Sequence, residues 1–153
     1  MLMPKACARL RARAAGDKFI DAVPMETFRE LGKTLTEMGV KAALIKAGHR
    51  GGFIRTADVA QLNAQTALAL PEENWRDREL WVPAFRADPA KVKTTTGAGD
   101  AAVAGFLCAI LRGQTVERAG KYAMLAGRDS LYGTDTTSGL TRWGRMTRTL
   151  NRI

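Results

Sequence analysis

The order of the patterned segments in this 153-residue chain predicts a layered α/β domain. One amphipathic segment comes first, three short apolar segments follow, and apolar helical patterns fill the last third of the chain. Apolar residues make up 46% of the sequence and charged residues 25%, which is the balance of a globular protein with a core of its own. We therefore expect a single domain in which helices cover a sheet.

The first third of the chain predicts one helix and two strands. Residues 24–38 carry apolar side chains three or four positions apart and end before a glycine, as an amphipathic helix does. Residues 40–45 are mostly apolar, which predicts a strand that is buried on both faces. The turn-rich stretch 47–52 then leads to a second strand over 53–56.

The remainder predicts one more strand and then helices. Residues 57–79 are ambiguous, and within them 71–74 has the composition of a loop. Residues 80–82 predict the third strand, and 101–112 an alanine-rich helix that we expect to be deeply buried. Another helix is expected over 115–128. The last helix follows the polar loop 133–139 and carries Leu140, Trp143, Met146 and Leu150 on one face.

The net charge of +9 is concentrated at the two ends of the chain. Residues 1–13 and 142–153 each hold four basic residues and no acidic one, so the body between them has 16 basic and 15 acidic residues. A nucleic-acid-binding protein usually carries its basic surface on the folded body. We therefore expect solvated basic ends, and nucleic acid is an unlikely partner.

The sequence also excludes several other classes of protein. It contains no run of the ~20 apolar residues that a membrane span needs, and its first residues lack the apolar core of a signal peptide. Two cysteines, Cys7 and Cys108, are too few for a disulfide scaffold or a four-ligand zinc site. We expect a cytoplasmic protein with no membrane association.

The strongest chemical signal is the glycine-rich turn before the alanine-rich helix. Gly97 and Gly99 allow the backbone to approach a ligand closely. Their amides, with those of Ala98 and Asp100, would lie at a helix N-terminus, which favours an anion. Asp100 then suits a base that accepts a proton from an attacking hydroxyl, or else an acidic residue that only stabilises the first helical turn. The short motif alone fits both interpretations.

The context of this turn resembles a known family. Residues 94–107, TTTGAGDAAVAGFL, are similar to the second signature of the ribokinase (PfkB-type) carbohydrate kinases, D-T-x-G-A-G-D-x-x-x-A-G-F-L. Residues 44–51, LIKAGHRG, resemble the family's strand-plus-turn segment V-[TK]-x-G-x-x-G, and 80–85 resembles the strand before the signature. The similarity spans about 24–140 and implies the ribokinase-like layered fold, with only its C-terminal, nucleotide-binding half present.

The resemblance implies ATP-dependent phosphorylation of a sugar hydroxyl, with ATP and Mg²⁺ as cofactors. Asp100 matches the family's catalytic base. The amides of Gly97, Ala98 and Gly99 match the anion hole for the transferring phosphoryl group. The strand-plus-turn residues Lys46, Gly48 and Gly51 are expected beside the nucleotide, and Lys46 either reaches the phosphates or is only solvated.

The departures from the family pattern are equally informative. Thr94 replaces the usual acidic residue, which puts the associated monovalent-cation site in doubt, and the family's N-x-x-E motif for magnesium is absent. We divide the chain into a basic lead-in, 1–23, and a kinase part, 24–153. The first half of a family kinase, with its sugar-binding groups, is not visible. We expect the chain alone to be inactive and to self-associate through the strand at 40–45, and the alternative is a non-catalytic remnant that binds a nucleotide or another subunit.

The remaining residues of note have simpler interpretations. His49, the only histidine, lies in a polar turn without evident metal-binding partners. Cys108 is expected to pack in the core of its helix. Trp75 and Trp81 could stack on a nucleotide base, although Trp81 on a strand fits the core, and Trp143 fits the apolar stripe of the last helix.

Overall fold

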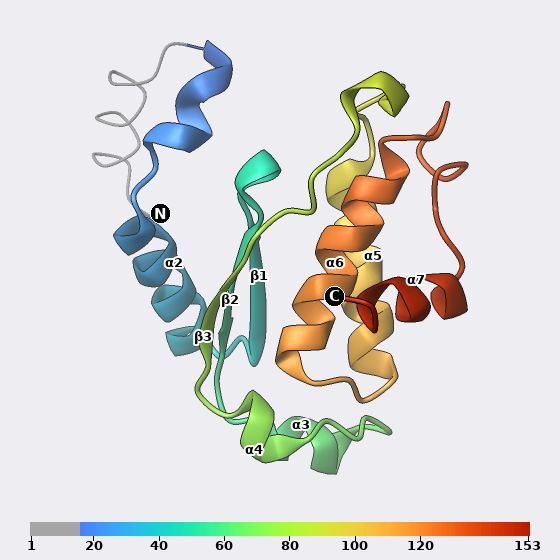
Figure 1. The fold of residues 1–153 in the computed structure, drawn as a ribbon. Coiled ribbons are helices and arrows are strands. Elements are labelled where there is room, and N and C mark those ends of the chain that lie inside the picture. The colour runs from blue at the N-terminus through green and yellow to red at the C-terminus, as the bar shows by residue number, and fades with distance from the viewer. Residues whose placement is uncertain (1–15) are drawn as a thin grey trace.

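The computed structural model describes residues 16–153 and confirms the α/β class. A three-stranded sheet stands between helix α2 on one face and the helices α5 and α6 on the other (Figure 1). The strands are β1 (Ala42–Lys46), β2 (Gly52–Thr56) and β3 (Glu79–Val82). The α-helices are α2 (Met25–Glu37), α3 (Ala60–Gln65), α4 (Glu72–Trp75), α5 (Ala98–Leu111), α6 (Val116–Ser130) and α7 (Trp143–Leu150), and the 3₁₀ turns are η1 (Gly16–Ala22), η2 (Gly48–Arg50) and η3 (Pro89–Lys91).

The sheet has the order β1-β2-β3, and both strand pairs are antiparallel. Leu44 of β1 pairs with Ile54 of β2, which pairs with Leu80 of β3. The hairpin between β1 and β2 closes through η2, and Gly51 ends it with a φ of +112° that favours glycine. Because antiparallel neighbours need only short connections, the sheet forms from strands close together in sequence.

Alternation along β2 divides the apolar residues between two cores. Ile54 faces the larger core, between the sheet and helices α5 and α6, where Leu125 and Phe106 are also buried. Phe53 faces the smaller core beneath α2, together with Phe28. Since successive strand residues point to opposite faces, one buried strand serves both layers.

The two long helices approach each other closely at Gly105 of α5. A side chain there would lie 2.7 Å from the backbone oxygen of Tyr122 and 2.8 Å from Cβ of Ala126, both on α6. One turn from the start of α5, Ala102 faces Gly127 of α6 in the same way. Small residues therefore bring the two helices into backbone contact, which fixes the position of the α5 N-terminus.

Most of the predicted elements are confirmed, but a loop and the burial of a helix are predicted wrongly. Residues 71–74 are not a loop, because α4 forms there and carries the fully buried Trp75, whose Nε1 donates to the Gln114 carbonyl at 2.9 Å. That burial also excludes Trp75 from stacking on a nucleotide. Helix α5 is not buried all round, and Cys108 is exposed on its outer side instead of packing in the core.

Strand β1 is less buried than expected because it lies at the edge of the sheet. Ala43 is buried, but Leu44 and Ile45 are only partly so. Within residues 16–153, no strand pairs with the outer side of β1. The predicted unpaired edge is therefore present in the described part of the chain, although several more exposed apolar side chains lie elsewhere, among them Met38, Leu111 and Ile153.

The C-terminal helix packs as its apolar stripe predicts. Trp143 stacks on Tyr122 of α6 with ring centroids 3.9 Å apart, and Met146 and Leu150 are buried, whereas Leu140 stays 43% exposed ahead of the helix. The basic residues 1–13 lie outside the described part of the chain. Among residues 16–153, no helix combines the length and the apolar character needed to cross a membrane.

We predict that Gly105→Ala destabilises the protein. The added methyl group would force α5 and α6 apart, and overpacking of this kind costs about 1–3 kcal/mol. The same change at Gly144 of α7, where the only neighbour is an Arg148 nitrogen 3.9 Å away, should stabilise the helix by up to about 1 kcal/mol. Urea unfolding of both variants measures the difference, and equal stabilities would contradict the close packing.

A second prediction concerns Glu117 of α6, which joins α6 to the segment before β3. Partial burial raises the pKa of Glu117, but a hydrogen bond from Asn74 and the ion pair with Arg78 outweigh this effect and bring the pKa below its ordinary value. A pKa that is lower in the folded state than in the unfolded state stabilises the protein at pH values above the unfolded-state pKa. This stabilisation is lost as the pH falls through the folded-state pKa. Unfolding free energies at pH 6 and pH 3 should therefore differ less in Glu117→Gln than in the unchanged protein.

Candidate functional site

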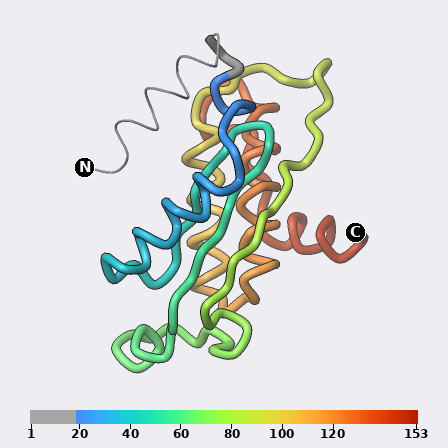
Figure 2. Tube along the Cα trace, turned by 90° about the vertical axis from the view of Figure 1, so that its left-hand side faces the viewer, coloured from blue at the N-terminus to red at the C-terminus, as the bar shows by residue number. Residues whose placement is uncertain are grey.

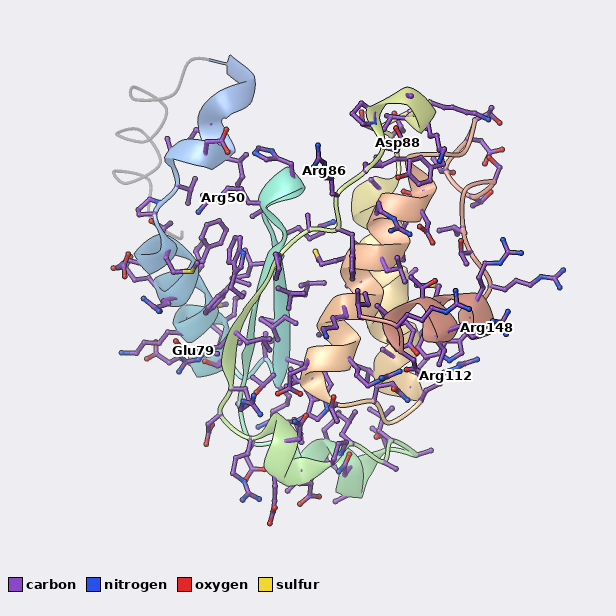
Figure 3. The ribbon with its side chains drawn as sticks, in the orientation of Figure 1. Arg50, Glu79, Arg86, Asp88, Arg112 and Arg148 are labelled. Carbon is purple, nitrogen blue, oxygen red and sulfur yellow. The ribbon has the colours of Figure 1, made fainter. Side chains whose placement is uncertain are left out.

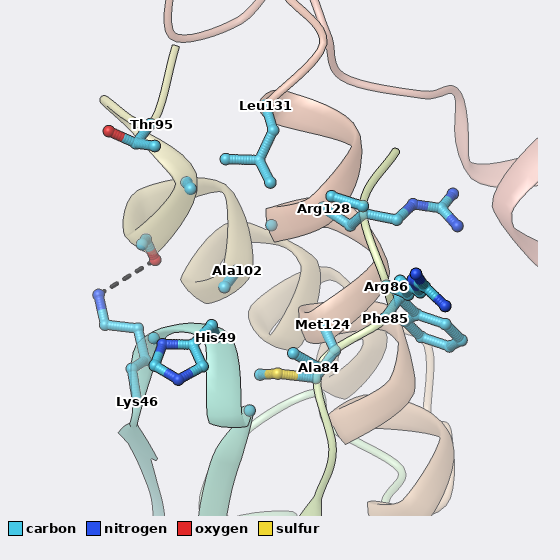
Figure 4. A pocket seen from close by; sticks show the side chains of 16 residues that line it. Lys46, His49, Ala84, Phe85, Arg86, Thr95, Ala102, Met124, Arg128 and Leu131 are labelled. Carbon is cyan, nitrogen blue, oxygen red and sulfur yellow. Dashed lines mark hydrogen bonds between the residues drawn. The ribbon is translucent and has the colours of Figure 1, made fainter. Parts of the chain in front are cut away.

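The end of β1 and the start of α5 border a recess among the described residues. Its volume is about 720 Å³, and its walls come from both layers of the fold (Figure 4). The lining residues are Lys46, Gly48, His49, Gly51, Ala84, Phe85, Arg86, Ala87, Thr95, Ala98, Gly99, Ala102, Met124, Gly127, Arg128 and Leu131. A recess of this size suits a ligand of nucleotide size.

Lys46 connects the two layers at the mouth of this recess. It is the last residue of β1, and its Nζ donates a hydrogen bond to the carbonyl of Gly99 at 3.1 Å (Figure 4). The side chain is exposed, so its ammonium group is accessible to a ligand. Strand β1 thus delivers a positive charge to the N-terminal turn of α5.

The N-terminal turn of α5 has the form that binds anions. Gly97 caps the helix with a φ of +84° and lies against the side chain of Thr136, so that a side chain at this position would meet Thr136 at 2.9 Å. Within the described chain, no acceptor pairs with the amides of Gly97, Gly99 or Asp100. Unpaired amides at the positive end of a 14-residue helix favour a negatively charged group.

The loop 133–139 is ordered by Asp135 next to this turn. The Asp135 carboxylate accepts hydrogen bonds from the amides of Thr137 and Ser138 at 2.8 and 2.7 Å and from the Thr137 hydroxyl. These bonds lower the pKa of Asp135 below its ordinary value. The loop therefore holds Thr136 in place against Gly97.

Asp100 lies in the first turn of α5 and is exposed. It does not line the recess, and neither does Gly97. The other five predicted site residues, Lys46, Gly48, Gly51, Ala98 and Gly99, all do. Since Ala98 and Asp100 are two positions apart on a helix, they point to different sides of α5. The first turn of α5 therefore faces the recess on one side and carries the Asp100 carboxylate on the other.

The charged side chains that line the recess are basic. Lys46, Arg86 and Arg128 contribute to its walls, and no aspartate or glutamate does. Arg128 lies 5.7 Å from the centre of the Phe85 ring and is paired with Asp129 at 2.5 Å. His49, at the opposite wall, pairs with Asp21 at 2.8 Å. The excess of positive charge favours an anionic ligand.

Sequence reasoning missed the apolar wall of the recess. Phe85 follows β3, Met124 lies on α6, and Leu131 directly follows the end of α6. None of them belongs to the glycine motifs, and their helical or strand periodicity indicates only burial. The strand-like segment before the signature was the one available signal, since it ends at Phe85.

Comparison with known proteins identifies the family. Residues 13–140 match the pattern of the pfkB family carbohydrate kinases. An uncharacterized sugar kinase of Archaeoglobus fulgidus is 30% identical over 102 residues, which cover 67% of this chain and 32% of that protein. The chain thus spans about a third of the length of this curated relative.

Solved structures agree on the fold. The nucleoside kinase of Methanocaldococcus jannaschii, an archaeal member of the ribokinase family, superposes with a TM-score of 0.59 at 18% identity and covers 99% of this chain and 47% of its own. The aminoimidazole riboside kinase of Salmonella enterica, complexed with aminoimidazole riboside and an ATP analog, gives 0.54 at 21% identity over 94% of this chain and 40% of that one. Both have the ribokinase fold that the signature implied. The match over residues 13–140 shows that this chain belongs to the pfkB family of carbohydrate kinases.

Proposed function

We propose that the chain forms the nucleotide-binding part of an ATP-dependent kinase that phosphorylates a hydroxyl group of a sugar or a sugar-containing acceptor. The observation that carries this proposal is the basic recess that opens beside the unpaired amides of the α5 N-terminus. Family membership supports it, as does the Salmonella relative, whose structure holds a riboside and an ATP analog. A cytoplasmic location, where ATP is abundant, fits the same proposal.

The recess suits a nucleotide in one orientation. Its basic residue Lys46 lies beside the α5 N-terminus, where the phosphates would be attracted. Its apolar wall, with Phe85, Met124 and Leu131, lies on the side of β3 and α6 and would accept the base. We therefore assign the phosphates to the turn at Gly97–Gly99 and to Lys46, with Gly48 and Gly51 leaving room at the end of the hairpin.

Asp100 is the proposed base for the acceptor hydroxyl. Its carboxylate follows the unpaired amides directly in the chain, and it is exposed on the side of α5 away from the recess. An acceptor on that side would place its hydroxyl between the carboxylate and the phosphoryl group held by the amides. The carboxylate would take the hydroxyl proton as the oxygen attacks phosphorus, and the amides would stabilise the negative charge on the transferring group.

Mg²⁺ fits this site only with the nucleotide present. Among residues 16–153, no three acidic, histidine or cysteine side chains come together to hold a metal ion, and Asp100 is the carboxylate nearest in sequence to the unpaired amides. Mg²⁺ is commonly held by one or two carboxylates together with water and substrate phosphates. Bound in this way, it would neutralise phosphate charge, and Asp100 would serve as its one protein carboxylate or remain free as the base.

Lys46 provides the test of the nucleotide site. We expect Lys46→Met to weaken ATP binding about tenfold, because one charge-assisted hydrogen bond to phosphate is lost. Lys41→Met, just ahead of the other end of β1, removes the same charge away from the recess and should leave binding unchanged. Isothermal titration of both variants and the unchanged chain with MgATP measures this. Absence of any ATP binding by the unchanged chain would contradict the proposed function.

Asp100→Asn tests the chemistry in an enzyme in which this segment is joined to a complete kinase fold. The asparagine keeps the shape of the side chain and the helix turn but cannot accept the proton. Turnover should fall by about 10²–10⁴-fold, the usual contribution of a general base, while nucleotide affinity stays nearly the same. If Asp100→Asn instead loses nucleotide binding but keeps normal turnover for each bound nucleotide, then Asp100 serves binding or structure and not proton transfer.

A further inference from the structure

A second recess lies between α7 and the loop that precedes it. Its volume is about 610 Å³, and it shares no lining residue with the recess at the α5 N-terminus. Its lining includes the hydroxyl-bearing residues Ser138 and Thr141 and three arginines, Arg142, Arg145 and Arg148, which we call the α7 arginines. Figure 3 shows Arg148 on α7, which lies on the opposite side of α6 from the sheet.

No acidic residue of the described chain neutralises the α7 arginines. Residues three apart on a helix are neighbours, so this spacing brings three positive charges together. Among residues 16–153, none of the three pairs with a carboxylate, whereas Arg78 pairs with Glu117 and Arg128 with Asp129. Residues 1–15 contain no aspartate or glutamate that could supply a partner. The recess therefore carries three charges for which this chain supplies no counter-ion.

The α7 arginines also lie where the helix itself is positive. Arg142 caps the helix, Arg145 follows within the first turn, and that turn contains no acidic residue. Arg148 turns back toward the same end, because its Nη1 lies 3.9 Å from the place that a Cβ of Gly144 would occupy. Helix N-termini favour negative groups, and natural sequences depart from such a rule mainly at functional or strained sites. A bound anion would remove this conflict.

We propose that this recess binds a small molecule that carries two linked phosphate groups. A guanidinium group donates two parallel N–H bonds to phosphate oxygens, so three of them offer more donors and more charge than one phosphate group uses. The site does not depend on the proposed kinase activity, because the two recesses share no residue. The composition predicts a solvated basic end here, and a bound diphosphate would instead neutralise it.

The surroundings of the recess favour a small molecule over nucleic acid. Proteins that bind single strands stack the bases on aromatic side chains, and none of the described residues that line this recess is aromatic. Trp143 of α7 already stacks on Tyr122, with ring centroids 3.9 Å apart, and the guanidinium carbon of Arg112 lies 4.8 Å from the centre of its ring. Figure 2 shows α7 as a short helix at one edge of the molecule, which offers a nucleic-acid strand little length to follow.

An NMR titration of the chain tests this site. Gly139 and Gly144 line the recess, so their amide signals report on it, while the Gly99 amide reports on the α5 turn. Pyrophosphate added at constant ionic strength should shift the signals of Gly139 and Gly144 along a curve that saturates. Inorganic phosphate should need a concentration about tenfold higher for the same shift, because it engages fewer of the guanidinium groups.

Arg145→Gln and Arg152→Gln form a matched pair for this titration. Arg145→Gln removes the central charge of the α7 arginines and should weaken pyrophosphate binding about tenfold. Arg152→Gln removes the same charge just beyond the other end of α7, where the residue is exposed and does not line the recess, and should leave the affinity unchanged. Lys46→Met should alter the response of Gly99 and not that of Gly144, which keeps this test separate from that of the nucleotide site.

Three results would overturn the proposal. If the signals of Gly139 and Gly144 show no saturable shift in the unchanged chain, the recess attracts an adventitious ion only. Equal pyrophosphate affinities in Arg145→Gln and Arg152→Gln would show that the anion does not bind through the α7 arginines. A single-stranded oligonucleotide that saturates the shift of Gly144 at a lower concentration of phosphate groups than pyrophosphate does would assign this surface to nucleic acid.

Discussion

The close contact between α5 and α6 at Gly105 is the constraint on which the arrangement of the site depends. Helix α6 is itself fixed to the sheet, because Gly120 allows Ile54 and Val82 to approach its backbone. Helix α5 contacts the sheet mainly through α6, so the two glycines determine where its N-terminus stands. Only with both helices in place does the Gly99 carbonyl come within 3.1 Å of the Lys46 ammonium. The site is thus positioned by packing that lies one or two turns away from it.

Most of the fold could be predicted from local patterns. The apolar spacing of α2 and α6 and the glycine punctuation gave element bounds within three residues of the structure. The failures have a common physical cause. Residues 71–74 look like a loop by composition, but burial of Trp75 in the main core stabilises a helical turn there. The residues of α5 after Asp100 are all small or apolar, so their pattern does not indicate which side of the helix is covered. The exposure of Cys108 could therefore not be predicted from the sequence.

The candidate site likewise contains some residues that the sequence indicates and others that it does not. The glycines, Lys46 and Asp100 stand in motifs whose residue types suit the proposed phosphate binding, and the motifs alone are enough to indicate them as candidates. The wall formed by Phe85, Met124 and Leu131 depends on how the segment after β3 and the C-terminal part of α6 meet in space. Its residues are ordinary apolar ones at ordinary spacings. The sequence therefore indicates the charged and glycine residues at this recess more readily than the apolar residues that line it.

The Lys46–Gly99 hydrogen bond has a consequence for how a ligand is received. The Lys46 ammonium group has three N–H donors and uses one of them for the Gly99 carbonyl. A phosphate at the proposed site could therefore accept a hydrogen bond from a second donor while the internal bond stays in place. The internal bond would hold the ammonium group beside the helix N-terminus before any ligand arrives, so less side-chain freedom would be lost on binding. A bound phosphate would then add a second connection between strand and helix to the one that the empty protein already has.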